Sequence, residues 1–399
     1  MVRAVVNAKL DSVACPELNL FHRRRCSFRV CGYTGLGLAI VLATTMAMRL
    51  GLSVTVTAAI VLVATLAFLG LVMATKIVTG EENIVYYHHE IAVVLTASVL
   101  LLLLREPLLP YLDLTILGIG TFLAFGRIGC FMVGCCHGRP CSWGVCYRQK
   151  HADAGFTPYY VGVRLFPVQL VESLWVLCTV IVGTCFVIRG EQSGAALAWY
   201  VVSYDLGRFS FEFFRGDAAR PYTWGFSQPQ WISVTLVWCV AAAEVAGILA
   251  LQRWHLAAAA GVTIAMVLIA LKRRFQRTAK FHLLHPRHVK EIAEMIDLSN
   301  PPGEALPNYR WAVFAKPASP QQEIRVGCTS LGIRVSASRT RLARESIEHF
   351  ALSRVDNEMS EDAAQSLAEI IARLTGSENA GQLVRGNGGV FHLLICQSA

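Results

Sequence analysis

The residues best suited to chemistry lie in the stretch YDLGRFSFEFFRGD at 204–217. Four of its polar residues fall within one helical stripe about 80° wide, namely Tyr204, Arg208, Glu212 and Arg215. Glu212 can then pair with both arginines. The stretch is either a structural ladder of ion pairs with arginines that extend to the membrane surface, or the wall of a pocket. Such a wall would bind an anion, because arginine matches phosphate or carboxylate with two parallel hydrogen bonds.

A further arginine, Arg127, stands near the end of an apolar run, in the stretch GRIGCFMVGCCHGR at 126–139. Gly126 and Gly129 beside it let another segment of backbone approach closely. Charged residues inside membrane spans are functional candidates by default, because their burial in lipid is costly. We therefore treat Arg127 as a second candidate ligand for an anion.

Polar residues also stand at the start of two other apolar runs. Gln169 and Glu172, in FPVQLVES, lie one helical turn apart and face the same way. The stretch YYHHE at 86–90 begins another run and contains Tyr87. Together with the two arginine-bearing stretches, these residues predict one arginine-rich cavity in a helical bundle, selective for an anionic ligand.

The cysteines after Arg127 raise the question of a metal site. Zinc sites favour repeated pairs spaced C-x2-4-C, whereas these cysteines are separated by four residues, none, four and four. We expect two adjacent cysteines not to ligate one ion in normal geometry, so the sequence predicts no metal and no cofactor. A disulfide in an oxidising compartment, or free thiols packed in a loop, are the alternatives. The residues in question are Cys130, Cys135, Cys136, His137, Cys141 and Cys146.

The composition indicates which elements hold these residues. Of 399 residues, 54% are hydrophobic and 16% charged, and the mean hydropathy is +0.48. Soluble domains carry about 25% charged residues, so the chain is expected to be a polytopic membrane protein with a smaller soluble part. The net charge of +9 is expected to reflect cytoplasmic Lys and Arg, with no nucleic-acid partner. No signal peptide is expected, because residues 1–30 lack an apolar core segment.

Sustained apolar runs predict an all-α polytopic membrane bundle of about seven to eight spans. The runs lie at 31–50, 51–75, 83–104, 111–134, 167–188, 194–214, 230–251 and 255–271. We expect three parts: a polar N-terminal segment at 1–30, the bundle at 31–271, and residues 272–399 as a basic juxtamembrane run followed by a small soluble α/β domain.

The expected tail domain combines strands with a helix. Strands are predicted at 309–316, within 324–338 and at 389–396, and the apolar spacing of 361–374 predicts a helix. Basic runs before the first span and after the last one predict that both chain ends are cytoplasmic, in agreement with an even number of spans.

Three motifs in order resemble the prolipoprotein diacylglyceryl transferase family. The family pattern Gly-Arg-x-Gly-Asn-Phe-x-Asn-Gly-Glu-x-x-Gly-Arg is retained at Gly126, Arg127, Gly129, Phe131, Gly134, Gly138 and Arg139. Its two asparagines are replaced by Cys130 and Val133, and its glutamate by Cys135. The pattern His-Pro-x-Gln-Leu-Tyr-Glu is retained at Pro167, Gln169, Leu170 and Glu172, with Phe166 and Val171 at the other two positions. The third, Tyr-x3-Arg-x3-Glu-Phe-x-Arg, is complete at Tyr204, Arg208, Glu212, Phe213 and Arg215.

The resemblance covers residues 31–251 and implies a seven-span bundle whose N-terminus faces outward, so that 255–271 would be an added span. Members of the family lie in the plasma (inner) membrane as multi-pass proteins. They move the diacylglyceryl group of phosphatidylglycerol to the lipobox cysteine of a prolipoprotein signal peptide, forming a thioether, and glycerol phosphate leaves. Lipid entry would require lateral gaps between spans, which Gly118, Gly120 and Gly126 would permit.

The resemblance also implies roles for residues. Arg127 and Arg208 would stabilise the leaving phosphate, and Tyr87 stands where the family has the histidine or tyrosine of its His/Tyr-Gly-Gly motif, with both glycines replaced. Tyr87 would accept the thiol proton only with a lowered pKa, and His88 or His137 are alternatives. The substrate-binding residues would be Gly126, Gly129, Cys130, Gly138, Gln169, Glu172, Tyr204, Glu212 and Arg215.

The replaced asparagines and glycines leave other functions open. The bundle would then keep its anionic-lipid pocket but bind or transport lipid, or use its own thiols for redox chemistry. A third interpretation, independent of the family, is a transporter with an arginine-lined anion site and a regulatory cytoplasmic domain.

Overall fold

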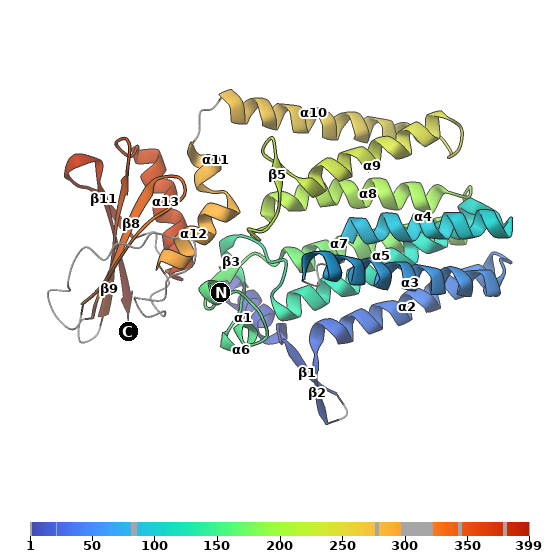
Figure 1. Cartoon of the computed structure of the whole chain (residues 1–399), viewed down its shortest axis with the longest axis horizontal. Coiled ribbons are helices and arrows are strands. Elements are labelled where there is room, and N and C mark those ends of the chain that lie inside the picture. Colours follow the sequence, from blue (N-terminus) through green and yellow to red (C-terminus); the bar gives the residue numbers. More distant parts are fainter. Residues whose placement is uncertain are drawn as a thin grey trace.

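The computed structural model of the protein describes residues 2–20, 22–80, 86–275, 279–296, 322–341, 345–377 and 381–398. Long helices lie side by side in a bundle, and a smaller sheet domain stands at one end of it (Figure 1). Both the N-terminal segment and the tail domain lie at this end of the bundle. The helices of the bundle therefore run back and forth between this end and the opposite one.

Each apolar run of the sequence corresponds to one helix among the described residues. The helices are α2 (Ser27–Arg49), α3 (Val54–Thr79), α4 (Tyr86–Leu104), α5 (Leu108–Val133), α7 (Val168–Arg189), α8 (Ala195–Phe211), α9 (Gln228–Val245) and α10 (Arg253–Phe275). In the described part of the chain, six of them are long and apolar enough to cross a membrane: α2, α3, α4, α5, α7 and α10. The shorter α8 and α9 pack between α7 and α10, and a polytopic helical bundle is confirmed.

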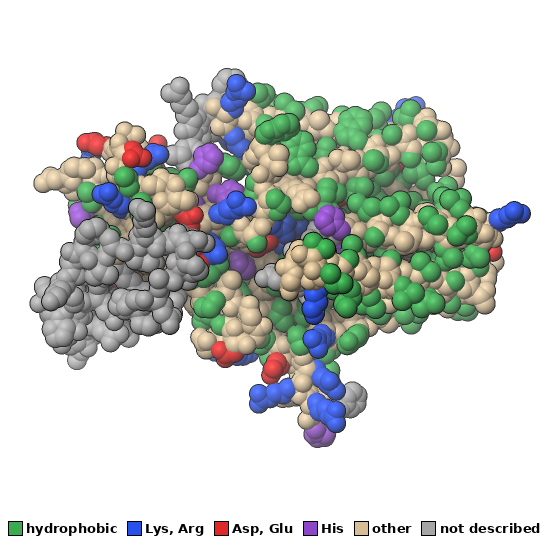
Figure 2. Space-filling model, viewed as in Figure 1, with side chains coloured by type: hydrophobic (Ala, Val, Ile, Leu, Met, Phe, Trp, Pro, Cys, Tyr) green, Lys and Arg blue, Asp and Glu red, His purple; other side chains and the backbone are tan. Residues whose placement is uncertain are grey.

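The outer surface of the bundle is that of a membrane protein. Large apolar side chains such as Leu66, Ile77 and Leu103 are exposed on it, and hydrophobic side chains cover this face (Figure 2). In water such a surface would be unfavourable, whereas lipid tails solvate it. The chain is thus a multi-pass membrane protein.

The loops at the tail-facing end carry their own structure. Before the bundle stand α1 (Val2–Val13) and a hairpin of β1 (Glu17–Leu20) and β2 (Arg23–Cys26). Between α5 and α7 the chain forms β3 (Pro140–Cys146), α6 (Gln149–Ala152), η1 (Pro158–Tyr160) and β4 (Arg164–Leu165). Between α8 and α9 lie η2 (Glu212–Phe214), β5 (Tyr222–Thr223) and β6 (Phe226–Ser227). These segments cap the ends of the helices that carry the predicted polar residues.

The tail is a small domain with both helices and strands, as expected. Its antiparallel sheet has the order β10-β11-β9-β8-β7, and the apolar face of α13, including Leu367 and Ile371, is buried. The predicted helix at 361–374 is α13, the strands within 324–338 are β7 and β8, and the strand at 389–396 is β11. The predicted strand at 309–316 lies outside the described residues. The elements are α11 (Ala279–Leu283), α12 (Pro286–Ile296), β7 (Gln322–Cys328), β8 (Ile333–Arg341), β9 (Glu345–Arg354), α13 (Glu361–Leu374), β10 (Gln382–Arg385), η3 (Asn387–Gly389) and β11 (Phe391–Ser398).

The start of the tail packs directly on the loops of the bundle. Arg287 donates to the backbone oxygens of Ala218, at 3.2 Å, and Arg220, at 2.9 Å. Arg139 donates to the backbone oxygen of Leu284 at 3.3 Å. The loop between α5 and α7 and the tail also share one hydrophobic core. The tail is therefore in contact with the loops that carry the family motifs.

Candidate functional site

The site is organised around Glu172, a fully buried carboxylate on the first turns of α7. Three guanidinium groups surround it. Its oxygens lie 3.1 Å from Arg127 Nη2, 3.3 Å from Arg208 Nη1 and 3.7 Å from Arg215 Nη1. The hydroxyl of Tyr204 donates to it at 3.4 Å. The predicted meeting of polar residues from separate runs is therefore present in the structure.

Helix ends bring these groups together. Arg127 stands near the C-terminus of α5, Arg208 near the C-terminus of α8 and Glu172 near the N-terminus of α7. Helix α5 stops because Gly134 adopts a left-handed conformation, with φ of 89°. The antiparallel arrangement of neighbouring helices then places all three ends on one side of the bundle. We call Arg127, Glu172, Arg208, Glu212 and Arg215 the arginine–glutamate centre.

One part of the predicted helical stripe is different in the structure. Arg208 and Glu212 pair at 2.8 Å as expected. Helix α8, however, ends at Phe211 and is followed by a single 3-10 turn, so Arg215 leaves the stripe. Its guanidinium Nε lies 2.9 Å from Asp217, and Nη1 faces Glu172. The expected side-chain pair of Glu212 with Arg215 is thus replaced by pairs with other carboxylates.

The structure adds three residues that the sequence analysis missed. Arg220 pairs with both Glu212 and Asp217, and Ser227 donates to Glu212 at 2.8 Å. Burial raises the pKa of Asp217, but the charges of Arg215 and Arg220 hold it well below its usual value. Asp217 and Arg220 follow directly after the motif in the stretch FRGDAAR, and the nearness of opposite charges was the available signal.

Within this set of ion pairs four arginines face three carboxylates, so one positive charge is left over. Three buried polar atoms here also have no hydrogen-bond partner among the described residues: Arg127 Nε, Arg215 Nη1 and Gln169 Oε1. Unsatisfied buried donors are costly. The surplus charge and the free N–H groups together suit an anionic oxygen ligand such as a phosphate.

Of the predicted residues on α4, Tyr87 reaches this region. Its side chain is buried and lies within electrostatic range of Arg208, Arg220 and Glu212. His88 is exposed at the surface. His137 packs against the rings of Phe156 and Tyr160 in the loop. Burial there lowers the pKa of His137, and its Nδ1 lies 2.9 Å from the backbone oxygen of Gly138.

The predicted glycines serve two different purposes. A Cβ on Gly138 would lie 2.3 Å from the backbone oxygen of Phe166, and one on Gly129 would lie 3.1 Å from Phe28 Cα, so both allow close packing. Gly126 has open space around its Cβ position. The expectation of a lateral gap at Gly120 is wrong, because this glycine packs closely against Tyr200 and Val180.

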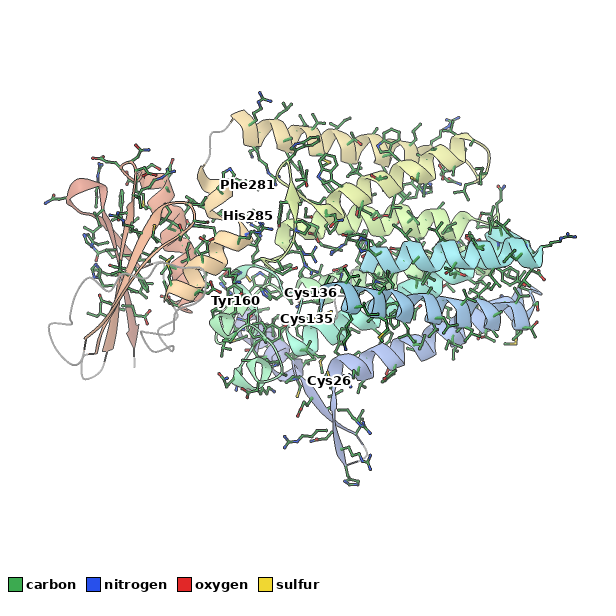
Figure 3. All side chains as sticks on the ribbon, viewed as in Figure 1. Cys26, Cys135, Cys136, Tyr160, Phe281 and His285 are labelled. Atoms are coloured by element: carbon green, nitrogen blue, oxygen red, sulfur yellow. The ribbon has the colours of Figure 1, made fainter. Side chains whose placement is uncertain are left out.

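The cysteines next to the centre also depart from expectation. The sulfur atoms of Cys130, Cys135 and Cys136 all lie within 4.8 Å of one another. Two adjacent cysteines were expected not to ligate one ion, yet the sulfur atoms of Cys135 and Cys136 converge. They do so because Cys136 has a positive φ of 54°, which turns the chain back toward the end of α5. Cys135 and Cys136 lie at the end of the bundle that faces the tail (Figure 3). We call these three residues the cysteine cluster.

The cysteine cluster is electrostatically linked to the centre. Hydrogen bonds from Cys130 and Cys135, with the charges of Arg215 and Arg127, lower the pKa of the Cys136 thiol well below its usual value, although burial opposes this. Gln169 holds the loop by donating to the backbone oxygen of Cys135 at 2.8 Å. Gly138 and Arg215 form an isolated β-bridge. Loop and centre therefore form one structural unit.

Fold and site together define a multi-pass membrane protein with a buried, arginine-rich cluster of charged residues at one end of its helical bundle. Comparison with known sequences makes this class specific: the profile of the prolipoprotein diacylglyceryl transferase family matches residues 27–246. The chain belongs to this family.

Curated relatives give the same result. The chain is 33% identical over 110 residues to a phosphatidylglycerol–prolipoprotein diacylglyceryl transferase of Clostridium tetani, a match over 28% of this chain and 43% of the relative. It is 30% identical over 132 residues to one from Clostridium perfringens, over 33% and 49%. It is 28% identical over 126 residues to one from Dehalococcoides mccartyi, over 32% and 46%. The chain thus spans less than half the length of these relatives.

Proposed function

We propose that this protein transfers the diacylglyceryl group of phosphatidylglycerol to the thiol of a lipobox cysteine in a prolipoprotein, in the plasma membrane. The observation that carries the proposal is the arginine–glutamate centre. Two of its nitrogen atoms, Arg127 Nε and Arg215 Nη1, are buried beside a surplus positive charge and make no hydrogen bond to the described residues. A phosphodiester oxygen supplies what these donors lack, and the relatives' names identify a phospholipid substrate of that kind.

In this proposal the arginines act on the leaving group. Attack of a thiolate on the glycerol carbon breaks a C–O bond and leaves a second negative charge on glycerol phosphate. Arg127, Arg208 and Arg215 stabilise this charge more strongly as it develops, in a site from which bulk water is largely excluded. Glu172 keeps the three guanidinium groups in place, so that little reorganisation is needed during the reaction.

The other predicted residues bind or position. Gln169 has a buried Oε1 without a hydrogen-bond partner among the described residues, which would accept a hydrogen bond from the glycerol headgroup. Gly126 leaves room for an acyl chain beside α5. From the end of α8, Tyr204 donates to Glu172, and Glu212 pairs with Arg208. Tyr87 lies on α4 within electrostatic range of Arg208 and Glu212, but an ordinary tyrosine, with a pKa of about 10, is protonated at neutral pH and so cannot accept the thiol proton.

Complementation tests the proposal. In a bacterial strain depleted of its own transferase, expression of this protein should restore growth and the formation of thioether-linked lipoprotein. Arg208→Ala and Arg127→Ala should abolish both, while the exposed Arg189→Ala on α7 should not. If the wild-type chain is present in the membrane and purified protein with phosphatidylglycerol and an acceptor peptide yields no thioether product, transferase activity is disproved.

A further inference from the structure

We propose that the cysteine cluster binds a zinc ion and that the acceptor cysteine of the prolipoprotein enters as the fourth ligand. This inference rests on the proposed function for the identity of the acceptor. It starts from a juxtaposition that the family pattern does not contain, since Cys130 and Cys135 stand at positions where the family has asparagine and glutamate. With Cys136 they bring three sulfur atoms together next to the arginines.

The geometry suits a metal ion of this size. Zn–S bonds of about 2.3 Å in a tetrahedral site separate the sulfur atoms by roughly 3.8 Å. The sulfur atoms of the cluster already lie within 4.8 Å of each other, so each needs to move by less than about 1 Å to bind. A disulfide would involve only two of the three thiols. The convergence of all three from the end of α5 and the following turn is what a metal site requires.

Two positively charged side chains lie close to Cys136 of the cluster. Zinc ligands are deprotonated, and thiolates are stabilised by neighbouring cations. Arg127 and Arg215 both lie within electrostatic range of Cys136. Three thiolates with one Zn²⁺ carry a net charge of −1, so arginines beside them are favourable neighbours.

The exposure of the cluster leaves a position open to substrate. Cys130 is buried and Cys136 is half-buried, whereas Cys135 is exposed. Structural zinc sites have four protein ligands, while catalytic sites keep three and leave one position for water or substrate. Three converging thiols at a partly exposed loop match the second arrangement. The cluster lies beside the arginines proposed to hold the lipid phosphate.

Such a site would provide the nucleophile. A thiol bound to zinc is deprotonated outright, and its proton passes to solvent. The acceptor sulfur then attacks the glycerol carbon, a C–S bond forms from the sulfur lone pair, and the C–O bond breaks with its electron pair leaving on glycerol phosphate. The step is redox-neutral and needs no oxidant or reductant. It removes the need for a strong protein base, a role for which Tyr87 is poorly suited.

Binding of the ion is tested on the purified, reduced full-length protein after removal of metals. Zn²⁺ titration should load a single ion per chain, and Co²⁺ in its place should give the near-ultraviolet thiolate-to-cobalt absorption of a tetrahedral sulfur site. Cys136→Ser and Cys135→Ser should lose both signals, whereas Cys239→Ser, an exposed cysteine on α9, should keep them. Absence of binding to the wild-type chain, or binding unchanged by both cluster variants, overturns the site.

The role of the fourth position is tested by adding the acceptor. A peptide with one lipobox cysteine should increase the thiolate-to-cobalt absorption, and the same peptide with serine should not. No response to the cysteine peptide overturns the acceptor-binding role. Transfer assays separate the two proposals. Full activity of metal-free protein and of Cys136→Ser would overturn the zinc inference and leave the transferase function standing. A cobalt response to the peptide without any thioether product would overturn the transferase function and leave the site standing.

Discussion

The arginine–glutamate centre and the cysteine cluster lie next to each other, yet they relate to the family in opposite ways. All five charged residues of the centre are retained from the family motifs, and Glu172 is contacted by three arginines from separate segments. In the cluster, Cys130 and Cys135 replace family residues. The difference follows from burial of charge. Loss of one ion from the centre leaves another buried and unpaired, whereas a neutral thiol replaces a neutral amide at Cys130 at smaller cost. At Cys135 the thiol replaces a glutamate, but this position is exposed.

Substitution of Glu172 is expected to have the largest effect on stability and activity. Glu172→Gln leaves three buried guanidinium groups without their common carboxylate, so we expect it to lower the free energy of unfolding by about 3–5 kcal/mol and to abolish transfer. Thermal unfolding in detergent and complementation measure the two effects. Glu191→Gln, at an exposed position after α7, is the matched control. A variant with wild-type stability would show that the centre is not held together by this carboxylate.

Arg127→Lys separates the role of charge from that of hydrogen bonding, because it keeps a positive charge near Glu172 but removes the Nε donor. Loss of one charged hydrogen bond to the lipid phosphate costs about 2 kcal/mol, or roughly 30-fold in affinity. Binding of phosphatidylglycerol to the purified protein measures this. Stability should change less than in Glu172→Gln. Equal lipid affinity in the variant and in the exposed control Arg189→Lys would contradict the assignment of Arg127 to the phosphate.

Sequence alone identified the members of the centre that interrupt apolar runs. Arg127, Glu172 and Arg208 are detectable because a charge within such a run is costly unless it has a partner. Asp217 and Arg220 were missed, since they lie beyond the apolar run and their pairing depends on the end of α8 at Phe211.

The convergence of the cysteines was not predictable from spacing. It depends on the positive φ of Cys136, a conformation that non-glycine residues adopt only when the surrounding structure imposes it. The same holds for the contact between tail and loop, because Arg139 and Leu284 are far apart in sequence. Helix positions, by contrast, followed from apolar length alone, and α13 was predicted with its observed bounds.

Gly138 tests whether loop and centre form one unit. In Gly138→Ala the new Cβ would lie 2.3 Å from the backbone oxygen of Phe166, and the loop that bridges to Arg215 must shift. We expect a loss of about 1–3 kcal/mol in stability and reduced transfer. Gly126→Ala, where the Cβ position is open, should change stability by less than about 0.5 kcal/mol. Equal stability of the two variants in thermal unfolding would show that the loop and the centre do not form one structural unit.

The smallest effect is expected at the junction with the tail, where His285 contacts the ring of Tyr222 at 4.4 Å between centroids. Burial, with the charges of Arg287 and Arg139, lowers the pKa of His285 to about 4. In an unfolded chain a histidine has a pKa of about 6.5. The folded junction therefore resists protonation, and its stability is unaffected above pH 6.5 or so but decreases as the pH falls toward 4.

Limited proteolysis of the tail as a function of pH measures this effect. Cleavage near the junction should become faster between about pH 6.5 and 4 in the wild-type chain, while His285→Gln should lose most of this pH dependence. His282, which is exposed, provides the control substitution. Since Arg139 links Leu284 to the backbone of Arg215, release of the tail should also weaken lipid binding at low pH. An unchanged lipid affinity after release would show that the centre holds its shape without the tail.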